Sequence, residues 1–250
     1  MNLAVLATAG LVFCRVAGLV AGLPVFSAQG VPKAIPIFTA VGVVLLIAPT
    51  VSLIEAPSNL LVLVVGVASE LLLGLLAGFS VRVVFAALHM GTELMALQMG
   101  LAMATMFNPL EKQQAGPLGT LASWTAGLAF LGTGLHLRCL EIVGRSFETL
   151  PPGGGFDIDQ LQLLLVGAEA SIRLGVQLSG PILVMVWFVN VLVAVLARLA
   201  PKMNVFFSVG MTITSSVGIV LVAISLPWVM AVHGAAVAET VSGLRRALMP

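Results

Sequence analysis

The sequence predicts an all-α protein that crosses a membrane several times. Of its 250 residues, 60% are hydrophobic and only 8% are charged, and the mean hydropathy is +1.16. Soluble domains carry about 25% charged residues, so the composition excludes a soluble catalytic domain. At about 20 apolar residues per crossing of a hydrocarbon layer about 30 Å thick, the chain has material for about six spans and little else.

Five apolar runs follow one another in the N-terminal part of the chain. The first run has no Lys or Arg before Arg15. It therefore lacks the basic segment of a cleaved signal peptide, and we expect it to remain as the first helix. Prolines, glycines and polar residues separate the runs. The predicted segments are residues 2–26, 37–54, 60–88, 89–107 and 120–142.

The longest polar stretch, residues 144–160, predicts a boundary between two parts of the chain. Its sequence, GRSFETLPPGGGFDIDQ, contains two prolines and three glycines, which disfavour helix, and charges, which disfavour lipid. We expect a helical part over residues 1–145, a polar linker over 146–160 and a long helical hairpin over 161–250.

Two very long apolar runs, residues 161–200 and 205–241, make up the predicted hairpin, and the basic sequence RLAPKMN joins them. A helix of about 37 residues extends about 55 Å, whereas the hydrocarbon core measures about 30 Å. The hairpin must therefore tilt, break or leave the bilayer. Alternatively, each run is two shorter elements, because Pro181 and several glycines supply possible breaks.

Charge and motif content argue against nucleic-acid binding, metal binding and catalysis. Eleven Lys and Arg against ten Asp and Glu give a net charge of +1, which leaves no basic surface for a run of phosphates. His89, His136 and His233 form no HExxH sequence, and Cys14 and Cys139 lack ligand spacing. There is no GxSxG sequence either. We expect no enzyme activity, no metal, no cofactor and two free thiols.

Small residues recur four positions apart on several predicted helices, as at Gly18 and Gly22 or at Gly74 and Gly78. In a membrane, such faces let helix backbones approach closely. They serve either internal packing of one bundle or packing against other subunits.

Methionines form a second pattern. Met95, Met99 and Met103 are spaced by four residues, so they share one face of a helix. Methionine is an adaptable filler of irregular gaps. The stripe is either core packing or a deformable seal that lines a conduit.

Six charged residues inside apolar runs are informative, because a charge is costly there. They are Arg15, Glu70, Arg82, Glu93, Glu169 and Arg173, of which Glu169 and Arg173 are four residues apart and are expected to pair locally. Glu70 must meet a cation, such as Arg15 or Arg82, or else be protonated. A structural ion pair between helices or subunits is one interpretation, and a proton relay is the other. A single carboxylate with no second acid or histidine nearby in sequence is a poor relay.

Four stretches of the chain occur in a characteristic order: RVAGLVAGLPVFSAQGVPKAIPI, ELLLGLLAGFSVRVVFAALHMGTELMALQMGLAMATMFNP, SFETLP and ARLAPKMNVF. Together they resemble the FliR family of flagellar biosynthetic proteins, the R-type subunit of the flagellar type III export gate. The injectisome relative is the T-type subunit. The resemblance covers about residues 8–230, and the combination of GTELMALQMGLAMA, NP and RLAPKMNVF is specific.

The resemblance implies a place in an assembly in the bacterial inner membrane, at the flagellar basal body. One R-type subunit joins several P-type and Q-type subunits in a helical ring through which unfolded flagellar proteins leave the cytoplasm. A P-like N-terminal part is fused to a Q-like C-terminal hairpin. The implied partners also include the A-type export protein and the B-type switch protein, which would lie beside the hairpin tip near 198–204. The tip residues are Arg198, Pro201, Lys202 and Asn204.

The family also has a loop that plugs the closed pore. By position, it matches residues 106–119, MFNPLEKQQAGPLG, whose polar residues are costly in lipid but comfortable in an aqueous lumen. An ordinary polar connection between spans is the alternative. The plug candidates are Met106, Phe107, Asn108, Pro109, Leu110, Glu111, Lys112, Gln113, Gln114, Gly116 and Pro117.

Two other functions compete with an export gate. Interrupted helices and buried charges also occur in small-molecule secondary transporters, but these require two related halves and a polar midplane site. The sequence has about five apolar runs in one half and two in the other. A membrane scaffold without a conduit differs from the gate only in lacking a lumen.

Overall fold

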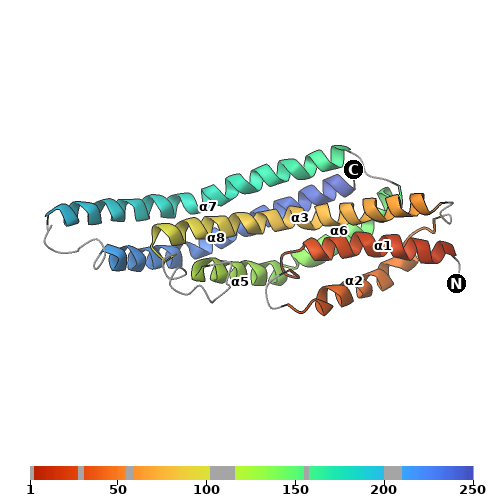
Figure 1. The fold of residues 1–250 in the computed structure, drawn as a ribbon, viewed down its shortest axis with the longest axis horizontal. Helices are drawn as coiled ribbons and strands as arrows, with labels where there is room; N and C mark the ends of the chain where they lie inside the picture. Colours follow the sequence, from red (N-terminus) through yellow and green to blue (C-terminus); the bar gives the residue numbers. More distant parts are fainter. Residues whose placement is uncertain are drawn as a thin grey trace. The chain divides into compact units, whose positions relative to one another are not determined.

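The computed structural model describes residues 3–27, 31–54, 59–101, 116–154, 158–199 and 210–249. These residues form seven α-helices and one short 3-10 helix, and they contain no strand (Figure 1). The prediction of an all-α fold is confirmed.

The described residues divide into two compact units. Unit 1 comprises those within residues 1–84, 130–170 and 237–250, and unit 2 comprises those within 85–129 and 171–236. Each unit is presented separately below.

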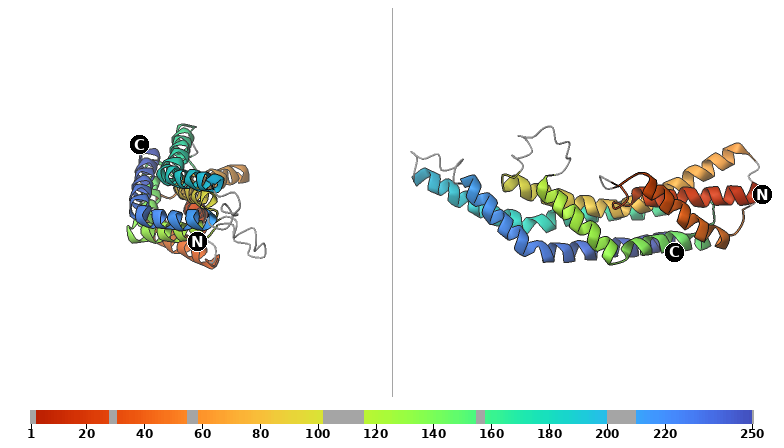
Figure 2. Two further views of the ribbon diagram at one scale, coloured as in Figure 1. Left: turned by 90° about the vertical axis from the view of Figure 1, so that its left-hand side faces the viewer. Right: turned by 90° about the horizontal axis from the view of Figure 1, so that it is seen from below.

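Helix α1 (Leu3–Gly22) forms the core of unit 1. Its side chains Val12, Val16 and Leu19 are completely buried. Helix α2 (Ala34–Ile47), continued by the 3-10 turn η1 (Ala48–Thr50), packs against α1, and the N-terminal part of α3 lies beside α1 (Figures 1 and 2). Helix α1 ends at Gly22, whereas the predicted first segment extends to residue 26. Pro24 accounts for the earlier end, because proline disfavours helix at the residue before it.

Helix α3 (Leu60–Gln98) is one continuous helix of 39 residues. The sequence predicted two segments that meet at residue 88, and this was wrong, because nothing between Leu88 and Gln98 breaks a helix. The helix ends where Gly100 adopts φ +73°. The Leu101 N–H donates to the Ala96 carbonyl (3.0 Å) and the Gly100 N–H to the Leu97 carbonyl (3.1 Å). This is a Schellman cap, so α3 stops before the predicted residue 107.

The predicted segment 120–142 is two helices, α5 (Pro117–Gly132) and α6 (Leu135–Thr149). Their axes differ by 59°, because Gly134 between them adopts φ +70°, which suits glycine. Helix α6 extends into the stretch predicted to be a linker. It is amphipathic: Leu135, Ile142, Val143 and Phe147 are buried on one face, while Arg138 and Glu141 are exposed. The charges therefore mark a helix face rather than a loop.

Helices α7 (Ile158–Leu199) and α8 (Met211–Leu248) are continuous, with 42 and 38 residues. Each contains an internal proline, Pro181 in α7 and Pro227 in α8. Because neither helix is interrupted at its proline, the alternative of two shorter elements per run does not hold. Helix α7 starts at Ile158, whereas the predicted hairpin starts at residue 161. At 1.5 Å per residue, both helices are longer than a bilayer core is thick.

Two clusters of buried side chains hold unit 2 together. One joins α3, α5 and α8 through Leu88, Ala126 and Val229. The other joins α3 to α7 through Met95, Met99 and the α7 residues Ile182 and Val186. Between α7 and α8, the Thr214 hydroxyl hydrogen-bonds the Asn190 side-chain oxygen at 3.1 Å. The two long helices therefore pack as a hairpin within unit 2.

Among the residues that the structure describes, four helical stretches are long and apolar enough to cross a membrane, and α5 with α6 counts as a fifth if the bent pair is one span. This is fewer than the six predicted, because two predicted segments merge into α3 and α2 alone has 14 residues. The four stretches are Ala4–Gly22, Leu60–Gln98, Ser179–Leu199 and Met211–Leu248. The chain is therefore a polytopic membrane protein.

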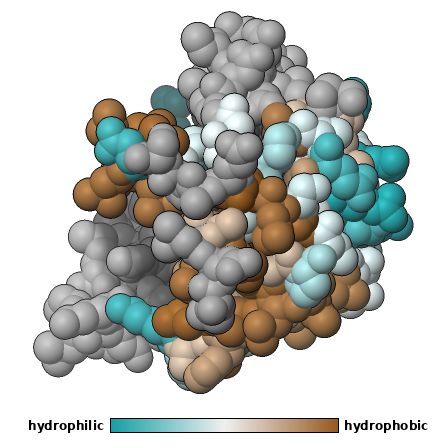
Figure 3. All heavy atoms as spheres, turned by 90° about the vertical axis from the view of Figure 1, so that its right-hand side faces the viewer, coloured by the Kyte–Doolittle hydropathy of each residue, from teal (hydrophilic) through white to brown (hydrophobic). Residues whose placement is uncertain are grey.

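Much of the apolar surface is uncovered by the chain itself. Large side chains on α2 and at the start of α3, such as Phe38, Leu46 and Leu60, are about three-quarters exposed. Among the coloured residues in Figure 3, hydrophobic side chains fill the middle of the face, and the largest group of hydrophilic side chains lies at its right-hand edge. Such a surface requires lipid or other protein chains to cover it.

Candidate functional site

A buried ion pair between α1 and α3 is the most polar feature of unit 1. The Arg15 Nε donates to Glu70 Oε2 at 2.5 Å, and the Arg15 Nη2 donates to Glu70 Oε1 at 2.9 Å. Both side chains are 1% exposed. This two-point geometry between guanidinium and carboxylate is the strong form of an ion pair.

Further partners complete the hydrogen bonding of this pair. The Arg15 Nη1 donates to the Ser146 hydroxyl (2.9 Å), and Nη2 also donates to the Leu150 carbonyl (3.0 Å). The Gly153 N–H donates to Glu70 Oε1 (2.9 Å). The ring of Phe147 lies 4.1 Å from the guanidinium carbon. Because buried ions are tolerated only when they are fully paired, this network fixes α1, α3, α6 and the turn after α6 to one another.

Glycines make the same helices meet closely. A Cβ on Gly18 would lie 2.7 Å from the Leu71 carbonyl oxygen, and one on Gly22 would lie 2.7 Å from the Gly78 Cα. At these distances no side chain larger than hydrogen fits. The small residues of α1 and of this part of α3 therefore serve packing within the chain.

In unit 2, Glu93 of α3 contacts the start of α5. The Gly116 N–H donates to Glu93 Oε1 at 2.9 Å. A carboxylate at this position also interacts favourably with the N-terminal end of the α5 dipole. Glu93 therefore fixes the point at which the chain enters α5.

Gly119 makes room for this contact. A Cβ on Gly119 would lie 2.6 Å from Glu93 Oε1 and 3.1 Å from His89 Nδ1. Both side chains therefore reach the same spot beside the first turn of α5. The His89 Nδ1 is buried and has no hydrogen-bond partner among the described residues.

The structure buries two of the stripe methionines in the core of unit 2. Met95 and Met99 are 2% and 0% exposed and pack against Ile182 and Val186 of α7. The Ser215 hydroxyl of α8 donates to the Met99 carbonyl at 2.6 Å. This burial favours the packing interpretation for these two side chains.

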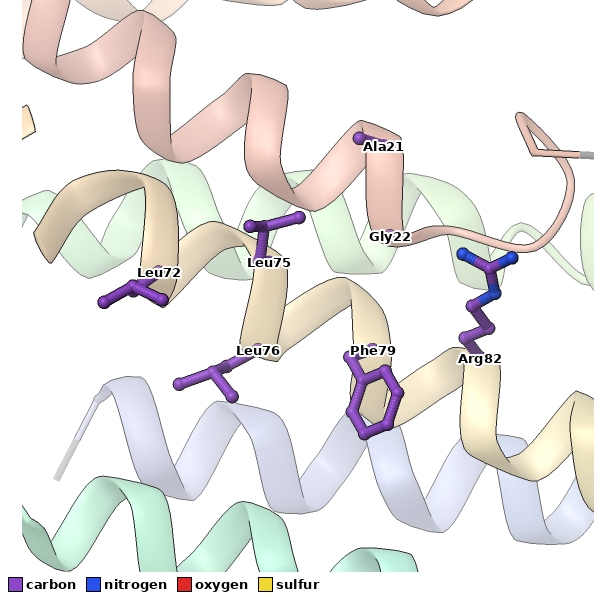
Figure 4. A pocket seen from close by; sticks show the side chains of 7 residues that line it. All are labelled: Ala21, Gly22, Leu72, Leu75, Leu76, Phe79 and Arg82. Carbon is purple, nitrogen blue, oxygen red and sulfur yellow. The ribbon is translucent and has the colours of Figure 1, made fainter. Parts of the chain in front are cut away.

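Arg82 does not join Glu70, although the sequence left that pairing open. It lies at one end of a shallow apolar groove of about 220 Å³ between α1 and α3 (Figure 4). In Figure 4 its side chain extends toward the end of α1. The groove is lined by Ala21, Gly22, Leu72, Leu75, Leu76, Phe79 and Arg82.

Several predicted site residues lie outside the described residues. These are Met103, the plug candidates from Met106 to Gln114, and the tip residues Pro201, Lys202 and Asn204. Gly116 and Pro117 are described and stand at the start of α5, and Arg198 is exposed in the last turn of α7.

Sequence reasoning missed the partners of the buried pair on and after α6. Ser146 and the Leu150 carbonyl carry no signal of their own, because their role depends on where α6 packs. Gly153 did carry one: it lies in the run PPGGG and adopts φ +78°, which favours glycine. Its freedom lets the turn present an N–H to Glu70.

Among the described residues, no group of three His, Cys, Asp or Glu side chains is arranged to hold a metal ion. Cys14 and Cys139 are free thiols.

Comparison with known proteins adds a family and several relatives. A model of the family described as bacterial export proteins, family 1, matches residues 6–240. The flagellar biosynthetic protein FliR of Pectobacterium carotovorum is 32% identical over 216 residues, which cover 86% of this chain and 82% of the relative. FliR of Escherichia coli K12 is 30% identical, with 85% and 82% covered. The Yop proteins translocation protein T of Yersinia pestis is 30% identical, with 68% and 66% covered.

Proposed function

The chain belongs to the bacterial export proteins, family 1, and we propose on that basis that it is a membrane subunit of a flagellar type III export apparatus. The observation that carries the proposal is the match over residues 6–240, together with FliR relatives aligned over more than four-fifths of both chains. The relative named for Yop translocation is aligned over a smaller share. A flagellar system is therefore the better assignment.

We further propose that the subunit forms part of a protein-conducting gate for unfolded flagellar proteins in the bacterial inner membrane at the flagellar basal body. Its exposed apolar side chains on α2 and α3 need cover. The P-type and Q-type subunits of the gate would supply part of it. The A-type export protein is a further partner. The B-type switch protein would contact the tip near Arg198, where α7 ends.

The plug proposal concerns residues 106–119. Support comes from the C-terminal edge of this segment, because Glu93 accepts a hydrogen bond from Gly116 and so fixes one end of the segment to α3. A polar segment that is held at this end suits displacement into and out of an aqueous lumen. Since Met95 and Met99 are buried in unit 2, the proposed barrier rests on this segment rather than on those two methionines.

Composition of the native complex tests the export-gate proposal. The tagged chain is purified in mild detergent from a flagellated bacterium and examined by native mass spectrometry. We expect one copy together with several copies of two other small hydrophobic subunits. A lone monomer or homodimer that is stable without partners would contradict the proposal and favour a small-molecule transporter.

Deletion of residues 110–116 tests the plug separately. We expect membranes that contain the assembled mutant gate to leak ions or small solutes, because the segment no longer fills the lumen. The same native mass spectrum shows whether the mutant gate assembles. An assembled mutant with an intact permeability barrier would refute the plug while leaving the gate assignment in place.

A further inference from the structure

Helix α5 begins without a capping side chain of its own. The residue before its first turn is Gly116, and its first residue, Pro117, has no backbone N–H. The Gly116 carbonyl accepts a hydrogen bond of the first turn from the Thr120 N–H at 2.9 Å. The Gly116 N–H in turn donates to Glu93 Oε1 of α3 at 2.9 Å. Glu93 therefore supplies from another helix what a capping residue supplies from within.

A second titratable side chain, His89, reaches the same point. A Cβ on Gly119, in the first turn of α5, would lie 2.6 Å from Glu93 Oε1, 3.0 Å from His89 Cε1 and 3.1 Å from His89 Nδ1. The imidazole edge and the carboxylate therefore converge where Gly119 has only a hydrogen. At this range a charge on one side chain acts on the other. The next charged residue along α3 is Arg82, seven positions before His89.

The Nδ1 atom of His89 is available for a new contact. It is buried and has no hydrogen-bond partner among the described residues. A neutral imidazole carries a hydrogen on one nitrogen, whereas a protonated imidazole donates from both. Protonation therefore makes Nδ1 a charged donor beside Glu93. The structure shows Glu93 bonded to Gly116, with the competing contact from His89 unmade.

Glu93 is the carboxylate that faces His89 among the described side chains of unit 2. Helix α5 contains no titratable residue. Helix α8 contributes His233, whose ring meets Phe85 one turn before His89 on α3. On α7, the charged side chain that the structure describes in this unit is Arg198, which is exposed in the last turn. The charge on Glu93 is therefore what a protonated His89 meets first.

We propose that His89 and Glu93 form a proton-controlled hold on the first turn of α5. While His89 is neutral, Glu93 accepts from Gly116, and its negative charge suits the N-terminal end of the helix dipole. Protonated His89 competes for the carboxylate through a charge-assisted hydrogen bond, and its positive charge opposes the same end of the dipole. Both effects loosen the first turn of α5 as the pH falls from about 8 to about 5, the range in which histidine gains its charge.

This inference concerns two helices of one chain, and it holds whether or not the chain conducts proteins. Only its consequence for transport rests on the proposed function. Because Gly116 belongs to the proposed plug, residues 106–119, protonation of His89 would weaken the hold on one end of that segment. The contact itself is measured on the purified chain, so a failure of this proposal and a failure of the plug proposal give different results.

Hydrogen exchange of the purified full chain in detergent tests the proposal. The protection of each amide is expressed relative to its unprotected exchange rate at the same pH. The amides of Gly116 and Thr120 report on the first turn of α5, and the amide of Gly127 reports on the middle of the helix. We expect protection of the first turn to fall about tenfold from about pH 8 to about pH 5, while protection of Gly127 stays constant.

Three variants identify the groups responsible. His89→Gln does not titrate and is expected to keep its protection at the lower pH. Glu93→Gln keeps an acceptor oxygen but has no charge to attract the imidazolium, so we expect a smaller fall than in the wild type. His136→Gln removes a histidine of α6 whose buried Nδ1 also lacks a partner among the described residues. It serves as the matched control, with the full fall retained.

Several outcomes would overturn the proposal. One is a first turn whose protection does not change with pH in the wild type, and another is the same fall in His89→Gln as in the wild type. A fall that His136→Gln abolishes equally would also overturn it, because the effect would not come from His89. If His89→Gln already lowers protection at the higher pH, His89→Phe, which keeps an aromatic ring, repeats the comparison.

Discussion

Glu70 and Glu141 each face an arginine, but their surroundings differ. The Arg15–Glu70 pair is 1% exposed. The Arg145–Glu141 pair, with Nη2 and Oε1 at 3.0 Å, is 58% and 57% exposed. Removing one partner of a buried pair leaves an uncompensated charge, which costs about 3–5 kcal/mol. An exposed pair contributes about 0–1 kcal/mol.

We therefore expect Glu70→Ala to lower the free energy of unfolding by about 3–5 kcal/mol and Glu141→Ala by less than about 1 kcal/mol. Unfolding of the purified chain in detergent, followed by circular dichroism, measures both. The double variant Arg15→Met with Glu70→Leu should recover much of the loss, because it removes both charges. Equal effects of the two single variants would mean that the buried network adds no stability.

Glu93 is predicted to hold the segment that precedes α5. Glu93→Ala removes the acceptor of the Gly116 N–H, whereas Glu93→Gln keeps an acceptor oxygen in the same place. We expect a leak of ions or small solutes through assembled gates with Glu93→Ala and little change with Glu93→Gln. A tight membrane with Glu93→Ala, in gates of normal composition, would show that this contact does not control the segment.

His233 of α8 is buried without hydrogen bonds to its ring. It is 2% exposed, neither ring nitrogen has a partner among the described residues, and its ring meets Phe85 edge-on at 4.9 Å. An unsatisfied buried polar group costs about 1–3 kcal/mol. We therefore expect His233→Phe to leave stability unchanged or to raise it, as measured by the unfolding midpoint. A marked loss of stability would instead indicate a polar contact that His233 makes in the folded protein.

At the scale of elements, the contact between α1 and α3 depends on hydrogen as the side chain. A Cβ on Gly78 would lie 2.6 Å from the Leu19 carbonyl oxygen, whereas one on Gly127 of α5 meets nothing within 4 Å. The two substitutions to alanine should therefore change the free energy of unfolding in opposite directions. Gly78→Ala separates the helices and should destabilise by about 1–3 kcal/mol, while Gly127→Ala should stabilise by up to about 1 kcal/mol. The same unfolding measurement tests both, and a stabilising Gly78→Ala would contradict the close packing.

The sequence predicts a secondary-structure element well where one physical cause determines that the element forms. Long apolar runs become helices because a helix satisfies every backbone hydrogen bond within the segment itself, and each long run holds a helix within its described part. Ends were predicted less well. Gly100 ends α3 through its left-handed conformation, but a glycine inside an apolar run gives no such signal in advance. Helix α6 was taken for a linker in part, because charged residues mark both loops and the solvent face of an amphipathic helix.

At the scale of the whole molecule, the candidate site could be predicted only as a set of residues. The cost of charge in apolar sequence singles out Arg15, Glu70, Arg82 and Glu93. It does not say which of them meet, because that depends on how helices distant in sequence pack. Glu70 and Arg15 are 55 residues apart, and Gly153 joins them from a third region. The structure also gives Glu93 a backbone partner, which no spacing of charges could indicate.

The glycine contacts of unit 1 also determine whether the chain crosses the membrane an odd or an even number of times before Arg82. Gly18 meets Leu71, and Gly22 meets Gly78, so the numbering rises along both helices and α1 and α3 run parallel. The Ile54 N–H donates to the Thr8 hydroxyl at 3.1 Å, so the chain has returned to the beginning of α1 by residue 54. If α1 and α3 both traverse the bilayer, α2 with η1 must traverse it in the opposite sense, although α2 is too short to do so alone. The chain would then traverse the membrane three times before Arg82. In two variants, one with a single cysteine at Ser27 and the other with a single cysteine at Asn59, the thiols should react with an impermeant reagent from opposite sides of the membrane.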